Sequence, residues 1–137
     1  AVQLAKYFGA EVTAVCSTKN LDLVKSLGAD EVIDYTKEDF TELDINYDMI
    51  FDAVGKIAPY KRKKSLAQHG TFVNVMAMSQ DLKLKKEDLD LLKNLCEHGK
   101  LKTIIDRTYC LEEIVEAHRY VDQGHKIGNV VIRINHN

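Results

Sequence analysis

The chain has 137 residues and a mass of 15.5 kDa, which is enough for one domain with a hydrophobic core. Hydrophobic residues make up 45% of the chain and charged residues 29%, as in ordinary soluble proteins, and no apolar run approaches the roughly 18 residues that a membrane-spanning helix needs. The formal net charge of -2 favours binding neither to nucleic acid nor to an anionic membrane, and the chain shows no signal-peptide pattern.

The chain opens on the pattern of a helix. Its apolar residues Ala1, Leu4, Ala5 and Phe8 are spaced at i, i+3, i+4 and i+7, and Gly9 provides a C-terminal stop. No capping residue precedes this helix, so we expect a chain that has been cut out of a longer protein.

Short strands and helices then alternate along the chain. Alternating or β-branched segments predict the strands, and apolar stripes bounded by glycine or proline predict the helices. The first predicted elements are a strand over 11–16, a helix over 21–27 with Asn20 as its N-cap, a strand over 31–34, a helical turn opened by Thr36 and Asp39, a strand over 47–54, a helix from Pro59 to about residue 68, and a strand over 71–76 after Gly70. The last are a long helix with Leu89, Leu92, Leu95 and Cys96 turned inward, a strand over 103–105, a helix carrying Leu111, Ile114, Val115 and Val121, and a strand over 129–134.

This alternation predicts an α/β fold with a doubly wound, mainly parallel sheet. In such sheets, ligands bind beyond the carboxyl ends of the strands, near the point where the strand order reverses. Candidate site residues therefore lie in the segments that follow the predicted strands, namely 17–20, Tyr35, 54–55 and 75–76.

Several segments resemble the cofactor domain of the medium-chain dehydrogenase/reductase superfamily. They occur in the family's order and together cover nearly the whole chain. The first three are the helix and strand of residues 1–12, Leu-Gly-Ala-Asp at 27–30 followed by Val-Ile-Asp-Tyr at 32–35, and Phe-Asp-Ala-Val-Gly at 51–55. The segments 105–109, 116–121 and 124–131 resemble the quinone-oxidoreductase and zinc-type-alcohol-dehydrogenase-like branch of that superfamily.

The resemblance implies a truncated, Rossmann-like NAD(P)-binding domain over 1–137. Residues 101–137 would be a strand–helix–strand unit that returns to a catalytic domain absent from this chain. The seven glycines include no Gly-x-Gly-x-x-Gly set, so the family's first strand and glycine-rich turn are also missing. We therefore expect weak or no binding of NADPH by this chain alone, and no turnover of substrate.

The predicted adenosine end of the cofactor site consists of Ser17, Thr18, Lys19 and Tyr35. An acidic residue at the end of the corresponding strand would favour NAD, whereas hydroxyls and an ammonium suit the 2′-phosphate of NADPH. Tyr35 matches the position where the family's NADPH-dependent members place a tyrosine beside that phosphate. The structural alternative is that residues 17–20 only form a turn with a helix cap.

The predicted nicotinamide wall consists of Val54 and Gly55, since a glycine at a strand end lets a cofactor approach closely. A simple strand-to-helix turn is the alternative for Gly55, and Asp52 is interpreted as a structural carboxylate and not as a base. No catalytic residue and no metal ligand is assigned in this chain. The resemblance implies NADPH-dependent hydride transfer to a quinone or an α,β-unsaturated carbonyl compound in the complete protein, with no role for nucleic acid or membrane.

Other patterns favour structural roles or remain open. Tyr60 and Lys64 match the Tyr-x-x-x-Lys pair of short-chain dehydrogenases, but a solvated basic helix face is the better interpretation. The odd number of cysteines, without a Cys-x-x-Cys spacing, predicts that the protein resides in a reducing cytoplasm.

A second function remains open, that of a non-catalytic half-protein acting as a folding or interaction module. Because the missing strand would lie between 11–16 and 47–54, those two strands either pair directly or leave free edges that favour self-association.

Overall fold

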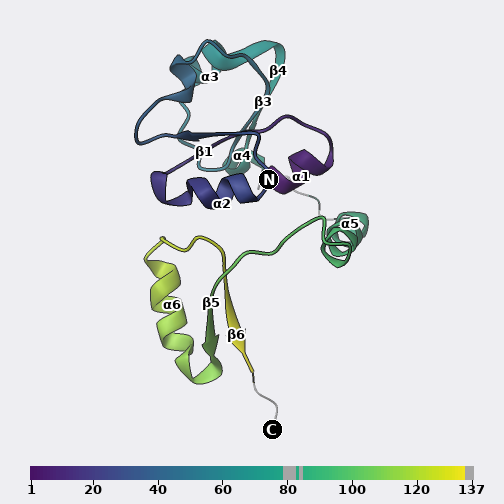
Figure 1. Cartoon of the computed structure of the whole chain (residues 1–137), viewed down its shortest axis with the longest axis vertical. Coiled ribbons are helices and arrows are strands. Elements are labelled where there is room, and N and C mark those ends of the chain that lie inside the picture. Colours follow the sequence, from purple (N-terminus) through teal and green to yellow (C-terminus); the bar gives the residue numbers. More distant parts are fainter. Residues whose placement is uncertain (79–82, 84, 135–137) are drawn as a thin grey trace.

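The computed structural model describes residues 1–78, 83 and 85–134, and its first half alternates helices and parallel strands as the sequence predicts (Figure 1). Every strand predicted there is present within a few residues of its expected place. The elements of this half are α1 (Val2–Tyr7), β1 (Thr13–Cys16), η1 (Thr18–Asn20), α2 (Leu21–Ser26), β2 (Glu31–Asp34), η2 (Phe40–Glu42) and β3 (Tyr47–Asp52).

The second half keeps the predicted order but moves two boundaries. Its elements are α3 (Pro59–Ser65), β4 (Leu66–Asn74), α4 (Val75–Met78), α5 (Lys86–Glu97), β5 (Ile105–Cys110), η3 (Leu111–Glu113), α6 (Ile114–Asp122) and β6 (Asn129–Arg133). The helix from Pro59 ends earlier than predicted, and Gly70 lies inside β4, where a Cβ atom would come within 2.9 Å of the Tyr47 carbonyl oxygen. The strand predicted over 103–105 begins at Ile105 instead and continues to Cys110.

The described strands form three two-stranded parallel sheets, β1 with β2, β3 with β4, and β5 with β6. The α/β class with parallel strands is therefore confirmed, but the strands do not join into one sheet within the described residues. In particular, β1 and β3 do not pair with each other, so of the two expected outcomes the described residues show unpaired edges and not direct pairing. One edge of each of these two strands carries no strand partner.

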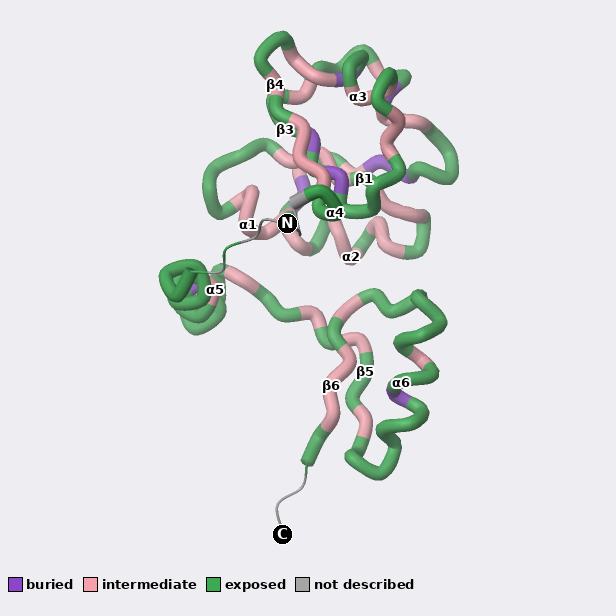
Figure 2. Tube along the Cα trace, turned by 180° about the vertical axis from the view of Figure 1, so that it is seen from behind, coloured by how far each residue is buried: buried purple, intermediate pink, exposed green. Residues whose placement is uncertain are grey.

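Burial is concentrated in the part of the molecule built by α1 to β4 (Figure 2). The buried apolar residues are Ala29, Ile33, Ile50, Leu95 and Ala117. Only Leu95 of the predicted inward stripe of α5 is buried, whereas Leu89 is 60% exposed and Cys96 is also exposed. The stripe prediction is wrong at these two positions because α5 lies beside the connection to β5 and no sheet covers it (Figure 1). None of the described helices is long and apolar enough to cross a membrane.

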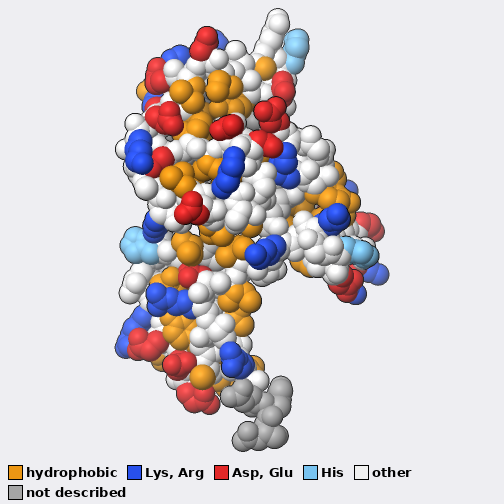
Figure 3. Space-filling view, in the orientation of Figure 1, with side chains coloured by type: hydrophobic (Ala, Val, Ile, Leu, Met, Phe, Trp, Pro, Cys, Tyr) orange, Lys and Arg blue, Asp and Glu red, His pale blue; other side chains and the backbone are white. Residues whose placement is uncertain are grey.

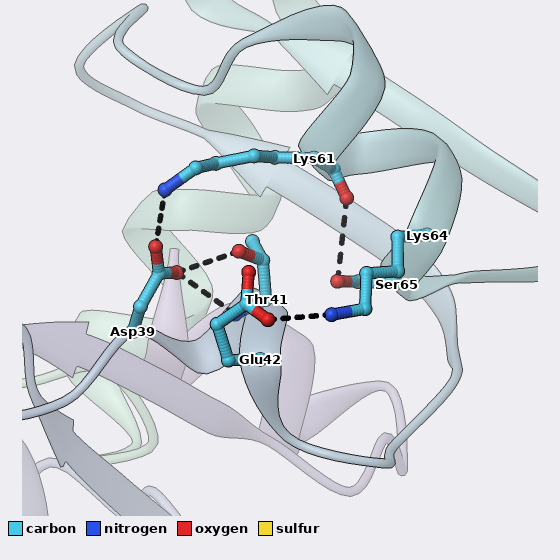
Figure 4. A network of polar contacts seen from close by, with 6 residues as sticks. All are labelled: Asp39, Thr41, Glu42, Lys61, Lys64 and Ser65. Atoms are coloured by element: carbon cyan, nitrogen blue, oxygen red, sulfur yellow. Dashed lines mark hydrogen bonds and ion pairs between the residues drawn. The ribbon is translucent and has the colours of Figure 1, made fainter.

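The basic segment of α3 packs against the acidic turn η2 (Figure 4). Asp39 caps η2 by accepting a hydrogen bond from the Thr41 amide at 3.0 Å, and it also pairs with Lys61. Lys64 pairs with Glu42 at 2.6 Å, while Tyr60 is 73% exposed. Lys63 and Lys64 are exposed but Lys61 and Arg62 are half-buried, so the predicted solvated basic face is found in only part of this segment. The prediction that Thr36 opens this turn is wrong, because its side chain binds Asp34.

Candidate functional site

The first cluster of polar groups lies where β1 and β2 end side by side. Cys16 and Asp34 are register partners, and the Tyr35 amide donates to the Cys16 carbonyl oxygen at 3.1 Å. The loop after β1 therefore lies beside the loop after β2, as is usual for neighbouring parallel strands. This arrangement brings the four residues predicted for the adenosine end into one place: Ser17 is half-buried, and Thr18, Lys19 and Tyr35 are exposed.

Asp34 lies beneath these loops and was not among the predicted residues. It is only 6% exposed. One of its carboxylate oxygens accepts from the Thr18 hydroxyl at 2.5 Å, and the other accepts from the hydroxyl and the amide of Thr36 at 2.7 and 3.0 Å. The Thr18 hydroxyl bond lowers the pKa of Asp34 most strongly, burial opposes it, and Thr36 and Lys37 add to it, so that the pKa lies at about 2. The carboxylate is therefore ionised at any ordinary pH.

These bonds define what the loop residues can offer to a ligand. The hydrogen of the Thr18 hydroxyl is given to Asp34, so Thr18 presents only its oxygen as an acceptor. The ammonium of Lys37, which was not among the predicted residues, lies 3.6 Å from the Asp34 carboxylate. Asn20 occupies the N-cap position of α2, but its side chain makes no capping hydrogen bond there. The signal that could have identified Asp34 is the Asp-x-Thr spacing, which is typical of a side chain that binds the backbone two residues on.

The second cluster lies where β3 and β4 end, and its centre is Asp52. This residue is 4% exposed and accepts hydrogen bonds from the amides of Gly55 at 2.7 Å, Val54 at 3.1 Å and Ile57 at 3.2 Å. Gly55 has a φ of +77°, a conformation that side chains other than glycine rarely adopt. Asp52 therefore shapes the loop that carries both residues predicted for the nicotinamide wall.

The chemistry of Asp52 matches the predicted structural role. Burial raises the pKa of this carboxyl, but the hydrogen bonds from the backbone amides of Gly55, Ile57 and Val54 outweigh burial and hold the pKa below its ordinary value. A carboxylate so fully occupied by backbone donors is not a general base. The register partner of Asp52 is Asn74, whose side-chain amide lies 3.5 Å from it and whose oxygen accepts from the amides of Met76 and Ala77. The sequence pattern did not indicate Asn74, because only the pairing of β3 with β4 places this residue beside Asp52.

The two clusters belong to different strand pairs, β1–β2 and β3–β4. A shallow cavity of about 590 Å³ lies elsewhere, at the amino end of β4, and is lined by Pro59, Arg62, Lys63, Leu66, Ala67, Gln68 and Gly70. It contains none of the predicted site residues. Within residues 1–78, 83 and 85–134, no group of three or more His, Cys, Asp or Glu side chains could hold a metal ion.

Known proteins resemble this chain in sequence and in structure. It is 36% identical to a chloroplastic quinone oxidoreductase, QR1, of Triphysaria versicolor over 96% of this chain and 47% of the relative. It is 35% identical to a chloroplastic NADPH-dependent alkenal/one oxidoreductase of Arabidopsis thaliana over 96% of this chain and 36% of the relative. The quinone oxidoreductase from Coxiella burnetii matches in structure with a TM-score of 0.81 at 29% identity, over 98% of this chain and 48% of that one. The chain thus spans about half or less of the length of these proteins.

The names of both sequence relatives place them in chloroplasts, and this finding contradicts the predicted cytoplasmic location. The prediction was wrong because it rested on cysteine usage. Three free cysteines indicate a reducing compartment as opposed to an oxidising one. They do not distinguish the cytoplasm from the reducing interior of an organelle, to which the relatives point.

A family model described as zinc-binding dehydrogenase matches residues 1–108. That match covers most of the chain, and the sequence relatives and the structural neighbour agree with it. The chain therefore belongs to the zinc-binding dehydrogenase family, within the medium-chain dehydrogenase/reductase superfamily.

Proposed function

We propose that this chain supplies the NADPH-binding part of an oxidoreductase that reduces a quinone or an α,β-unsaturated carbonyl compound. The observation that carries the proposal is the meeting of Ser17, Lys19 and Tyr35 at the adjoining ends of β1 and β2. Membership of the family supports a nicotinamide cofactor. The names of the two relatives, a quinone oxidoreductase and an NADPH-dependent alkenal/one oxidoreductase, support the substrate class.

The residues present suit the adenosine end of such a cofactor. The Ser17 hydroxyl can donate to a phosphate oxygen, and Lys19 brings a positive charge to the same turn. The exposed ring of Tyr35, 62% accessible, can lie beside the adenosine. A carboxylate on the surface of this turn would repel a 2′-phosphate, and none follows β1 before α2.

At the other cluster, Val54 and Gly55 form the wall of the proposed nicotinamide subsite. The bound nicotinamide would supply the hydride, and the protein would supply its position. The positive φ of Gly55 and its missing side chain let a ligand come close to the backbone that Asp52 fixes.

The described residues include no set of ligands for the zinc ion that the family's name implies. Their free cysteines, Cys16, Cys96 and Cys110, come from three different elements, and no histidine or carboxylate group completes a site around any of them. No step of the proposed function therefore runs through a metal held by these residues.

The last strand pair supports the proposed assignment of 101–137 to a unit that returns to a catalytic domain. Helix α6 packs on β5 and β6, and this unit lies apart from the strand pairs β1–β2 and β3–β4 (Figure 1).

We also propose that the chain self-associates. Apolar side chains reach the surface (Figure 3), and on β1 and β3, each of which has an unpaired edge, they include Val15, Met49 and Phe51, which are 42%, 61% and 46% exposed.

The proposed function predicts the cofactor preference of the intact enzyme. Its kcat/KM should be higher with NADPH than with NADH, measured by oxidation of the reduced cofactor with a quinone and an enone as acceptors. Lys19→Glu should narrow or invert the preference, because it places a carboxylate where the 2′-phosphate is expected. The matched charge reversal Lys63→Glu, on the exposed surface of α3, should leave the preference unchanged. Equal kcat/KM values for both cofactors, unaltered in Lys19→Glu, would contradict the proposal.

A further inference from the structure

A second cation lies at the ends of β1 and β2, on the loop after β2. The ammonium of Lys37 is 3.6 Å from the Asp34 oxygen that also accepts the Thr18 hydroxyl hydrogen. Sharing one carboxylate oxygen places Lys37 next to the turn that carries Ser17 and Lys19. The side chain of Lys37 is 68% exposed, so its ammonium remains open to a ligand.

Asp34 determines where this cation lies. Its carboxylate binds the hydroxyl and amide of Thr36, and its backbone carbonyl accepts from the amides of Lys37 at 2.9 Å and Glu38 at 3.0 Å. At the same time it holds Thr18 on the neighbouring loop. One residue, more than nine-tenths buried, therefore fixes both loops relative to each other and the backbone from which Lys37 extends.

The charges of this arrangement favour a dianionic ligand more strongly when Lys37 is present. A buried carboxylate below a phosphate would repel it, and the ammonium that lies beside the carboxylate offsets this repulsion. An ammonium has three N–H donors, so it can keep Asp34 as one partner and still donate to a phosphate oxygen. Lys37 can thus bridge the carboxylate and the ligand without moving away from either.

We propose that Lys37 is a second cation of the 2′-phosphate subsite, beside Lys19, and that Asp34 is the positioning residue that holds it there. This inference rests on the proposed function and adds residues to its adenosine end. The subsite then consists of the Ser17 hydroxyl and two ammonium groups above a buried carboxylate, which is a donor set matched to a phosphate monoester and not to a ribose hydroxyl.

The test uses two adenosine ligands that differ in the 2′-phosphate, adenosine 2′,5′-bisphosphate and AMP, and measures their dissociation constants for the whole chain by NMR titration at millimolar ligand, because the chain alone is expected to bind such ligands weakly. The wild-type chain should bind the bisphosphate more tightly than AMP. Lys37→Met should weaken binding of the bisphosphate about tenfold and leave AMP unchanged, as expected for the loss of one charge-assisted hydrogen bond. Added salt should reduce the effect. The control Lys63→Met, which removes the same charge from α3, should change neither constant.

The variant Asp34→Asn tests whether Asp34 positions Lys37 or merely lies close to the proposed phosphate subsite. If Asp34 only repelled the ligand, removing its charge would tighten binding of the bisphosphate. If it holds Lys37 and the two loops, the variant should lose selectivity for the bisphosphate over AMP. Unchanged selectivity in Lys37→Met, or tighter bisphosphate binding in Asp34→Asn, would overturn the inference while leaving the proposed function intact. A wild-type chain without preference for the bisphosphate would overturn both.

Discussion

Asp34 and Asp52 occupy equivalent places, each as the last residue of its strand and each more than nine-tenths buried. Both are ionised and surrounded by donors, Asp34 by hydroxyls and Asp52 by backbone amides. Buried carboxylates in such surroundings determine the shape of the loop that follows. The proposed ligand groups are therefore presented by loops that two aspartates hold in place.

The bonds of Asp52 predict a clear cost of removing it. Asp52→Ala leaves three backbone amides without their acceptor and should lower the free energy of unfolding by about 2–3 kcal/mol. Asp48→Ala, at an exposed position of the same strand, should change it by less than about 0.5 kcal/mol. Urea denaturation of both variants measures the difference, and equal stabilities would contradict the role given to Asp52.

The lowered pKa values of Asp34 and Asp39, both about 2 against an ordinary 3.8, predict how stability depends on acid. A carboxyl with a lower pKa in the folded state contributes stability above its unfolded pKa and loses that contribution as the pH falls towards the folded value. The melting temperature should therefore fall between about pH 4 and pH 2. Asp34→Asn should melt lower at neutral pH and show a smaller fall. An identical pH profile for the variant would argue against the contacts described for Asp34.

At the scale of elements, close backbone contacts explain why glycine occurs where it does. Asp106 joins β5 to α6 by accepting a hydrogen bond from the Tyr120 hydroxyl at 2.7 Å, and to the loop before β6 by accepting one from the Ile127 amide at 2.9 Å. In the same loop, a Cβ atom on Gly128 would lie 2.7 Å from the Ile104 carbonyl oxygen. Several of the segments that resemble the family at its carboxyl end are thus segments that hold β5, α6 and β6 together.

This close contact predicts that replacing Gly128 by alanine destabilises the chain more than replacing Gly99 does. Gly128→Ala forces backbone atoms apart and should destabilise the chain by about 2–3 kcal/mol. Gly99→Ala meets no atom within 4 Å and bears only the strain of its φ of +66°, so it should cost about 1 kcal/mol. Denaturation midpoints of the two variants provide the comparison. A cost for Gly99→Ala as large as that for Gly128→Ala would contradict the packing described for this loop.

Local patterns predicted the order of the elements, but contacts between distant segments determined where they end. The spacing of apolar residues identified the strands around Ile33 and Ile50 because these strands have a buried side. Gly70 was expected to lie between a helix and a strand, and nothing local shows that it approaches the Tyr47 carbonyl from within a strand. Likewise, Asp34 was predicted only as a strand residue, because its partner Thr18 lies 16 positions away.

For the molecule as a whole, the unpaired edges of β1 and β3 are the basis of the proposed self-association. The described strands leave one edge of β1 and one of β3 without a partner, and exposed apolar side chains lie on both strands. The last strand pair is joined to the first half by the side chain of Gln3, which binds both the carbonyl oxygen and the amide of Lys102 at 2.9 and 2.7 Å. These two hydrogen bonds connect residues 99 positions apart in the chain.

Free strand edges predict that the chain associates with itself as its concentration rises. Light scattering over a wide concentration range should show a mass that increases above that of the monomer. Arg or Lys substitutions at Val15 and Phe51 should reduce this increase, because charges at an edge disfavour pairing. A strictly monomeric mass at all concentrations would show that the edges do not recruit a second copy.

In the proposed function, the loops after β1 and β2 receive the adenosine phosphate of NADPH, and the loop after β3 receives its nicotinamide side. Backbone amide NMR of the chain, titrated with NADPH and separately with NADH, tests this claim most directly. At millimolar concentrations, as weak binding requires, NADPH should shift the amides of 17–19, 35–37 and 54–55, and NADH should affect 17–19 and 35–37 much less. Equal responses to both cofactors at 17–19, or shifts confined to the cavity lined by Pro59 to Gly70, would contradict it.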